Sequence, residues 1–262
     1  MDEARFAWRF PQVLTMTWLL VGGVSFSIHA KAADQSSTTK DPLEVINRPI
    51  FSFNLKADRY ALKPVAKAYT KITPDPVEQS LARFFANLYE PITAANDLLQ
   101  LKLIYFASDV GRFAINSTLG VAGLFDFATP LGLPKRREDF GQTLGYWGAG
   151  TGWYLMLPLL GPTTARDGTG KVVDWAISPN RLIDDSSVSW GLYAADIIVS
   201  RASYLDADKI LDSVFDPYAF TRDGYLQRRQ YMISDGQAAD PGSQAAPPWE
   251  GDDNIPPPWE QE

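Results

Sequence analysis

The chain of 262 residues contains no cysteine and a single histidine, His29. Without cysteine it forms no disulfide, carries no thiolate nucleophile and offers no Cys-based zinc or haem site. His29 lies in the first 32 residues, so a chain that loses this segment also lacks the imidazole of Ser-His-Asp and Cys-His catalytic systems. We therefore expect no metal and no cofactor, while carboxylate-only and Ser-Lys chemistries stay open.

Basic residues are outnumbered by acidic ones, 24 Lys and Arg against 31 Asp and Glu, which gives a net charge of −7. Six of the acidic residues, and no Lys or Arg, lie in residues 237–262, so that residues 33–236 carry only −2. A nucleic-acid partner is not expected, because neutralising a phosphate backbone requires clustered Lys and Arg.

Both ends of the sequence differ from its middle. Residues 1–32 hold two arginines, an apolar stretch and a small-x-small site at Ala30–Ala32, a pattern typical of a secretory signal cleaved before Ala33. An uncleaved membrane anchor is the alternative. The polar residues 33–40 suit a flexible lead-in.

The last segment, residues 237–262, contains six prolines besides its acidic residues. Such a composition predicts a disordered tail, because it cannot bury enough apolar surface to offset the ordering entropy. The tetrapeptide Pro-Pro-Trp-Glu occurs at 247–250 and again at 257–260. It is either a docking motif for a partner groove or low-complexity sequence.

Between the two ends, apolar residues recur at helical spacing and indicate an all-α domain over residues 41–236. Pro76 would sit in the first turn of one helix, and Ser186-Ser187 would cap another. No alternating pattern predicts a hairpin. The stripes are Val77, Leu81, Phe84, Phe85 and Leu88; Phe106, Val110 and Phe113; and Val188, Leu192, Ala195, Ile198 and Val199.

Residues 119–133, LGVAGLFDFATPLGL, form an apolar run that glycines and prolines interrupt. The run is too broken for a membrane-spanning helix, which needs about 20 apolar residues. It is either a core loop or a segment that lies in one bilayer leaflet.

A glycine cluster follows at Gly145, Gly148, Gly150 and Gly152. Its spacing matches neither the dinucleotide fingerprint nor a P-loop. Glycine tolerates backbone angles that other residues avoid, so the cluster indicates either a mobile loop or a tight turn beside aromatic residues.

Many short motifs occur in one order across residues 41–236. They are Asp41-Pro42-Leu43-Glu44, Asn47-Arg48, Phe53-Asn54, Leu62–Ala66, Asn87-Leu88, Glu90-Pro91, Asn96–Gln100, Gly111–Phe113, Ile115–Gly120, Gly123–Asp126, Glu138–Gly145, Leu157-Pro158, Gly161-Pro162, Arg166-Asp167 and Asp216–Tyr218. In this order and wording the chain resembles the VacJ/MlaA family of outer-membrane phospholipid-trafficking proteins.

The resemblance implies a single ring- or disc-shaped domain of amphipathic helices that lies in a membrane leaflet around a central amphipathic channel. It implies removal of mislocalised phospholipid from the outer leaflet of the outer membrane. The lipid would pass to a soluble periplasmic carrier that feeds an inner-membrane ABC transporter, and an outer-membrane porin trimer would be a further partner. The expected location is the periplasmic face of the outer membrane.

Family members are typically lipoproteins anchored through an acylated cysteine, which this sequence lacks, so the resemblance leaves embedded apolar surface to hold the protein. It also assigns residues to roles. The candidates for the channel or its gate are Phe53, Asn54, Gly148, Gly150 and Gly152, and those for membrane embedding are Leu119, Leu124, Phe125, Phe127 and Leu131.

Two other functions remain open. One is a structural porin-associated protein; the other is a periplasmic hydrolase that uses carboxylates, for which Glu138-Asp139 or Asp184-Asp185 are candidates. Adjacent residues do not face one another on a helix, so a catalytic pair would have to come from distant segments. The motif residues Asn47, Asn54, Asn87, Asn96, Asn116 and Arg112 either line a channel or satisfy buried backbone.

Overall fold

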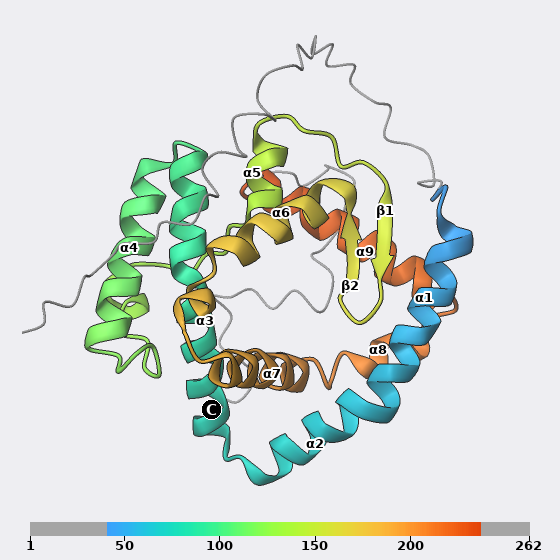
Figure 1. Ribbon diagram of the computed structural model, residues 1–262, viewed down its shortest axis with the longest axis horizontal. Coiled ribbons are helices and arrows are strands. Elements are labelled where there is room, and N and C mark those ends of the chain that lie inside the picture. The colour runs from blue at the N-terminus through green and yellow to red at the C-terminus, as the bar shows by residue number, and fades with distance from the viewer. Residues whose placement is uncertain (1–40, 237–262) are drawn as a thin grey trace, which may run out of the picture. The chain divides into compact units, whose positions relative to one another are not determined.

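The computed structural model describes residues 41–236. The expected signal segment (1–32), lead-in (33–40) and acidic tail (237–262) lie outside the described residues. As expected from the sequence, this part of the chain is mainly helical (Figure 1). Its elements are α1 (Glu44–Ala57), the π-helix η3 (Asp58–Leu62), α2 (Lys63–Ile72), α3 (Asp75–Leu99), α4 (Leu103–Thr118), the short η4 (Thr129–Leu131), α5 (Phe140–Tyr146), β1 (Tyr154–Leu157), β2 (Gly161–Thr164), α6 (Ala165–Ile177), η5 (Pro179–Leu182), α7 (Ser186–Ser203), α8 (Asp208–Ser213) and α9 (Pro217–Ile233).

Three of these helices confirm the predicted apolar stripes. Helix α3 has Pro76 in its first turn, where a missing N–H costs no hydrogen bond, and α4 and α7 carry the other two stripes. The predicted cap of α7 is wrong. Asp185, not Ser186 or Ser187, is the N-cap, and its carboxylate accepts hydrogen bonds from the backbone N–H groups of Ser187 and Val188 at 2.7 and 3.3 Å.

The first three elements, α1, η3 and α2, run without a break from residue 44 to residue 72 and form a curved helical arm (Figure 1). Residues 58–62 form a wider π turn, which changes the helix faces that continue into α2. Arg201 of α7 holds this turn through paired hydrogen bonds to Asp58 at 2.7 and 2.9 Å. The bend is therefore fixed by a charge pair between distant segments.

A two-stranded antiparallel hairpin, β1–β2, corrects the expectation that no hairpin competes with helix. Its strands are four residues each, and β1 reads YLML, an apolar run without alternation. Such short runs cannot be assigned to helix or strand by period. Leu159 in the connection and Gly161, the first residue of β2, adopt positive φ, which closes the turn.

Contacts between neighbouring elements close a circuit within the described residues. In order, α1 contacts β1, β1 pairs with β2, β2 contacts α6, and α6 packs on α5; then α5 contacts α3, α3 contacts α7, and α7 packs on α2, which leads back through η3 to α1. Such a circuit agrees with the expected ring of helices. None of the helices described here has both the length and the apolar character needed to cross a membrane.

The interior of this fold is unusually polar. Among the described residues, ten apolar side chains are buried, against eighteen polar or charged ones, and thirty-five large apolar residues are exposed. A compact apolar cluster consists of Tyr154, Met156 and Tyr218 with four flanking residues. Ordinary soluble domains bury charged residues rarely and only when paired. The usual distribution of polarity between inside and outside is therefore inverted here.

Candidate functional site

Helix α4 shows the inversion within one element. Its buried residues, Asp109, Arg112 and Asn116, are all polar and recur at helical spacing. On another face, Val110 and Phe113 of the predicted apolar stripe are exposed. The stripe that the sequence indicates is real, but it is not part of a closed core: with Phe106 it lines an open apolar groove beside α3.

Arg112 and Asn116 organise the loop after α4. The guanidinium of Arg112, 2% exposed, donates to Glu90 at 3.1 Å, to Thr129 at 3.0 Å and to Asp126 at 3.3 Å. The side-chain amide of Asn116 donates to Asp126 at 3.0 Å. Burial raises the pKa of Asp126, but hydrogen bonds from Thr129 and Asn116 and the charge of Arg112 outweigh it and lower the pKa to about 2. Asp126 is thus a charged, half-buried centre of the loop.

This polar centre directs the apolar side chains of the loop outward. Of the predicted embedding residues, Leu119, Phe125, Phe127 and Leu131 are exposed, and Leu124 is half-buried. The core-loop alternative for residues 119–133 therefore does not hold. An apolar surface that a polar network supports from behind is suited to contact with lipid.

The tryptophan side chains are also exposed rather than buried. All four tryptophans in the described residues, Trp147, Trp153, Trp175 and Trp190, are 51–70% exposed. In membrane proteins, the amphipathic indole ring is enriched at the boundary between lipid tails and water. Their exposure adds a second, independent sign of a lipid boundary.

The predicted gate residue Asn54 links α1 to the hairpin. Its side-chain amide donates to the carbonyl of Leu157 and accepts from the N–H of Leu159, both at 2.8 Å. These two contacts copy the pairing that a neighbouring strand would make. Asn54 therefore has a structural role at the junction of α1 and the hairpin.

Asn47, two helical turns earlier, makes the equivalent contact. Its amide donates to the carbonyl of Tyr154 at 3.0 Å and accepts from the N–H of Met156 at 2.9 Å. A separation of seven residues places both asparagines on one face of α1. We call this pair, Asn47 and Asn54, the amide clasp.

Of the other predicted gate residues, Phe53 lies beside Asn54 on α1 and the three glycines directly precede the hairpin in sequence. Phe53, next to the clasp, is exposed and thus free to contact lipid. Gly148 has φ +89 and ends α5: its N–H and that of Ala149 donate to the carbonyls of Gly145 and Leu144, both at 2.9 Å, a Schellman motif. Gly148 is therefore a tight-turn glycine.

The remaining two glycines differ from each other. Gly152 also has positive φ, and a Cβ added there would lie 2.8 Å from Cβ of Ala165. At Gly150, an added Cβ would meet nothing within 4 Å and the backbone is not left-handed. Of the three candidates, Gly150 alone can be substituted without a clash or a forbidden backbone angle.

The carboxylates proposed for a hydrolase are engaged elsewhere. Glu138 accepts a hydrogen bond from Gln100 at 2.9 Å. Asp139 caps α5 and receives both Nη atoms of Arg229 at 2.5 and 2.9 Å. Asp185 caps α7. Glu138, Asp139 and Asp185 therefore each have a structural partner, and the hydrolase alternative gains no support from these three.

A buried carboxyl pair lies where α3 packs on α4. Asp97 and Asp109 are both fully buried, and Arg136 pairs with Asp109 at 3.0 Å. Burial raises the pKa of Asp97 to about 8, and the neighbouring carboxylates of Asp109 and Glu138 add to the shift. Burial beside Asp109 therefore favours the protonated form of Asp97.

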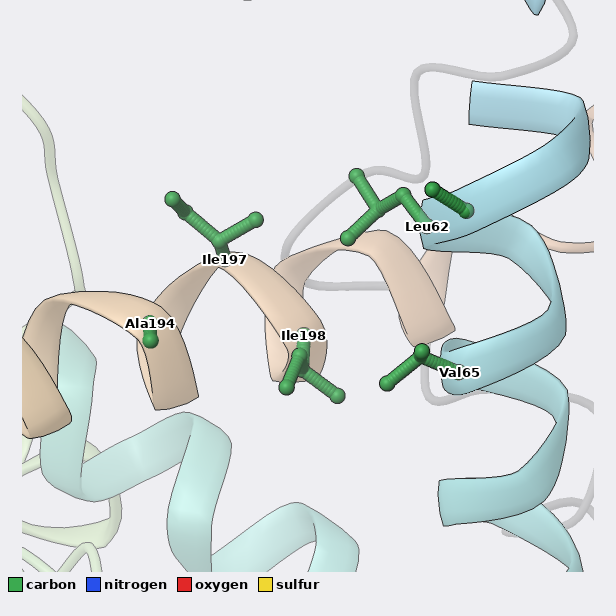
Figure 2. Close-up of a pocket in the computed structure, with 6 residues that line it drawn as sticks. Leu62, Val65, Ala194, Ile197 and Ile198 are labelled. Atoms are coloured by element: carbon green, nitrogen blue, oxygen red, sulfur yellow. The ribbon is translucent and has the colours of Figure 1, made fainter. Parts of the chain in front are cut away.

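An open aliphatic groove of about 300 Å³ lies between the arm and α7. Figure 2 shows Val65 of the arm and Ile198 of α7 on its two sides. All six lining residues are apolar: Ala61, Leu62, Val65, Ala194, Ile197 and Ile198. Such a surface offers contact to a hydrocarbon chain and no polar recognition.

Several structural roles were not predicted from the sequence. Asp139 and Thr164 are N-caps that bond to the N–H of Gln142 and Asp167, three residues later. That spacing is a readable helix-start signal. Arg229, which joins Asp139 to Asp167, carries no such signal because its partners are 90 and 62 residues away.

Comparison with known proteins gives consistent matches. The family model for MlaA lipoprotein matches residues 39–232. An intermembrane phospholipid transport system lipoprotein MlaA of Escherichia coli is 34% identical over 232 residues, 84% of this chain and 87% of that protein. The corresponding Haemophilus influenzae protein is 35% identical over 216 residues, 78% of this chain and 83% of its own. An uncharacterised protein of Rickettsia typhi is 38% identical over 195 residues, 74% of this chain and 78% of its own.

A solved structure, described as the structural basis for maintenance of bacterial outer membrane lipid asymmetry, is also similar. Its TM-score is 0.67 at 34% identity, and the match covers 74% of this chain and 98% of that one. The similarity therefore extends through sequence, family model and fold.

Proposed function

Since this chain belongs to the MlaA lipoprotein family, we propose that it takes part in intermembrane phospholipid transport and helps to maintain outer-membrane lipid asymmetry. Phospholipid is moved without covalent chemistry. The observation that carries the proposal is the inverted polarity of the fold, in which charged residues such as Arg112 and Arg229 are buried and large apolar residues are exposed.

The inverted polarity supports a position within one leaflet at the periplasmic face of the outer membrane. Burying apolar surface contributes about 25 cal/mol per Å², so thirty-five exposed large apolar residues would be costly in water and favourable among lipid tails. Helices too short or too polar to cross a bilayer can still lie in its interface. The loop at residues 119–131 and the exposed tryptophans provide this contact.

A phospholipid needs polar surroundings for its head and apolar surroundings for its tails. Both types of surface occur in the closed circuit of elements. The aliphatic groove of Figure 2 suits an acyl chain, and the buried Arg and Asn side chains provide the polar surroundings. We assign the channel to this circuit. A soluble periplasmic carrier and a porin trimer are the partners that this route requires on its two sides.

The gate belongs to the hairpin and the glycine loop that precedes it. The amide clasp holds the hairpin against α1, with Phe53 beside it. Gly148 and Gly152 fix the two ends of the loop by their positive φ, so movement concentrates at Gly150. A β-branched residue at 150 restricts the backbone without a clash.

The test compares Gly150→Val with wild type and with the deletion in the source organism. We expect Gly150→Val to accumulate normally and yet to leave more phospholipid on the cell surface, as the deletion does. Gly148→Val is the matched control for a folding defect, because a valine at φ +89 is strained and should lower the protein level. Normal surface lipid in the Gly150→Val strain would refute the gate.

Transport itself is tested by lipid analysis of the detergent-purified protein. Phospholipid should copurify with the wild type, and the deletion strain should show surface phospholipid. A protein that carries no lipid and whose deletion alters only porin levels would instead support the structural porin-associated function.

A further inference from the structure

Helix α2 presents three different faces along its ten residues, KPVAKAYTKI. Ala66 is fully buried where the helix packs on α7. Val65, Ala68 and Ile72 form an exposed aliphatic face, with Ile72 80% exposed. Lys63, Lys67 and Lys71 recur every four residues and form a cationic row, roughly a third of a turn away from the aliphatic face.

The lysines of this row are not used to hold the fold together, apart from Lys63, which pairs with Asp208 at 2.8 Å. Lys67 and Lys71 are exposed, their ammonium groups form no ion pair or hydrogen bond with any other described residue, and helix α2 contains no acidic residue. Lys56, near the end of α1, is exposed and unpaired in the same way. Most other basic residues of the described chain form ion pairs, as Arg112, Arg201 and Arg229 do.

We propose that the cationic row of α2 binds the negatively charged headgroups of the leaflet in which the aliphatic face of the same helix lies. The proposal rests on the leaflet position proposed above. A helix with apolar residues on one face and Lys on the next lies along the membrane interface with its charges at headgroup level. Val65 belongs both to the aliphatic face and to the groove of Figure 2, so the row borders the lipid-contacting surface.

The row therefore makes membrane association of the arm depend on anionic lipid. Each Lys near an anionic surface strengthens binding about fivefold, so the loss of two lysines is expected to weaken it about thirtyfold. Because charge interactions at the membrane surface are screened, this difference should shrink as salt rises. Residues 33–236 carry a net charge of −2, so the attraction comes from this local row and not from the overall charge.

The experiment measures partition of the purified full chain from detergent into two kinds of vesicle at low salt. One is phosphatidylcholine alone; the other is two-thirds phosphatidylcholine and one-third phosphatidylglycerol. The double variant Lys67→Gln/Lys71→Gln should bind the anionic vesicles about thirtyfold more weakly and the neutral vesicles as wild type does. Lys67→Arg/Lys71→Arg should retain wild-type binding to both.

Lys209→Gln is the matched control, because Lys209 is an exposed lysine of α8 that pairs with Asp206 at 3.0 Å and lies outside the row. It should change neither binding constant, whereas Lys67→Gln alone should weaken anionic binding about fivefold. Equal weakening on both kinds of vesicle, or no weakening on the anionic ones, would overturn the proposal. The proposal would also be overturned if the double variant Lys67→Gln/Lys71→Gln lost binding to an acidic protein while it kept wild-type binding to the anionic vesicles.

Failure of the proposed leaflet position would look different. If wild type itself bound neither kind of vesicle, the leaflet position would be wrong, whatever the lysine variants did. If wild type bound neutral vesicles and gained nothing from phosphatidylglycerol, the leaflet position would stand and the cationic row would lose its role.

Discussion

Replacing Asn47 with alanine tests whether the amide clasp holds α1 to the hairpin. Asn47 is 1% exposed, so its removal leaves the carbonyl of Tyr154 and the N–H of Met156 without these partners in a buried place. Asn47 also donates to the Asp41 carboxylate at 3.0 Å. The loss of this bond and of the two neutral ones, together with the cost of unsatisfied buried groups, amounts to at least about 2–4 kcal/mol. For a domain of this size we expect the unfolding midpoint to fall by roughly 4–16 °C.

Asn54→Ala removes only the two hydrogen bonds to the hairpin, whereas Asn47→Ala also removes one to the Asp41 carboxylate, so Asn54→Ala should cost less, about 1–2 kcal/mol. The N–H of Leu159 lies at an exposed turn, where water replaces the lost amide. Ser52→Ala is the control on the same helix, because the Ser52 hydroxyl is exposed and bonds only to the backbone of its own helix. Its effect should stay within about 0.5 kcal/mol.

Thermal unfolding in detergent, followed by circular dichroism, gives the order of the three variants. The clasp argument requires Asn47→Ala to be the most destabilised and Ser52→Ala the least. If Asn54→Ala lost as much stability as Asn47→Ala, burial would not determine the cost. If both asparagine variants matched Ser52→Ala, the clasp would contribute nothing to the fold.

Two further predictions concern the interior. The pKa of Asp97 is raised to about 8 from an unfolded value of about 3.9, so between these values the folded state binds one more proton than the unfolded state and the free energy of unfolding should fall as pH rises from 4 to 8. Asp97→Asn should flatten this dependence and should unfold at a higher temperature than wild type at pH 8. An unchanged slope of the unfolding free energy against pH would refute the prediction. At Gly170, an added Cβ would lie 2.3 Å from N of Gly141, so Gly170→Ala should destabilise the α5–α6 contact by about 1–3 kcal/mol in denaturant unfolding, and wild-type stability would contradict the close approach.

The helices of this fold could be predicted from the sequence because their apolar stripes recur at helical spacing. The direction in which a stripe faces could not. Phe106, Val110 and Phe113 look the same whether they face a core or lipid, since the 3.6-residue period contains no information about the surrounding medium. Only the family resemblance suggested that apolar residues such as Phe125 would face outward.

The contacts that define the candidate site were less accessible to sequence reasoning. Asn47 and Asn54 meet a strand more than a hundred residues away, and nothing local in the sequence points to that pairing. The hairpin itself was missed because its strands are too short to show a period. The glycines were recognised as special, but whether Gly148 turns or moves depends on a φ angle that only the structure gives.

The polar interior also affects which substitutions the protein tolerates. In an apolar core, Leu, Ile and Met can often replace one another because dispersion forces have no preferred direction. The guanidinium of Arg112 instead meets its acceptors at fixed angles, and even lysine cannot reproduce that fork. Toward the lipid, by contrast, fluid tails adapt to any aliphatic shape, so exchanges at Leu119 or Leu131 cost little. Natural variation should therefore concentrate on the apolar outside and spare the polar inside, the reverse of what soluble proteins show.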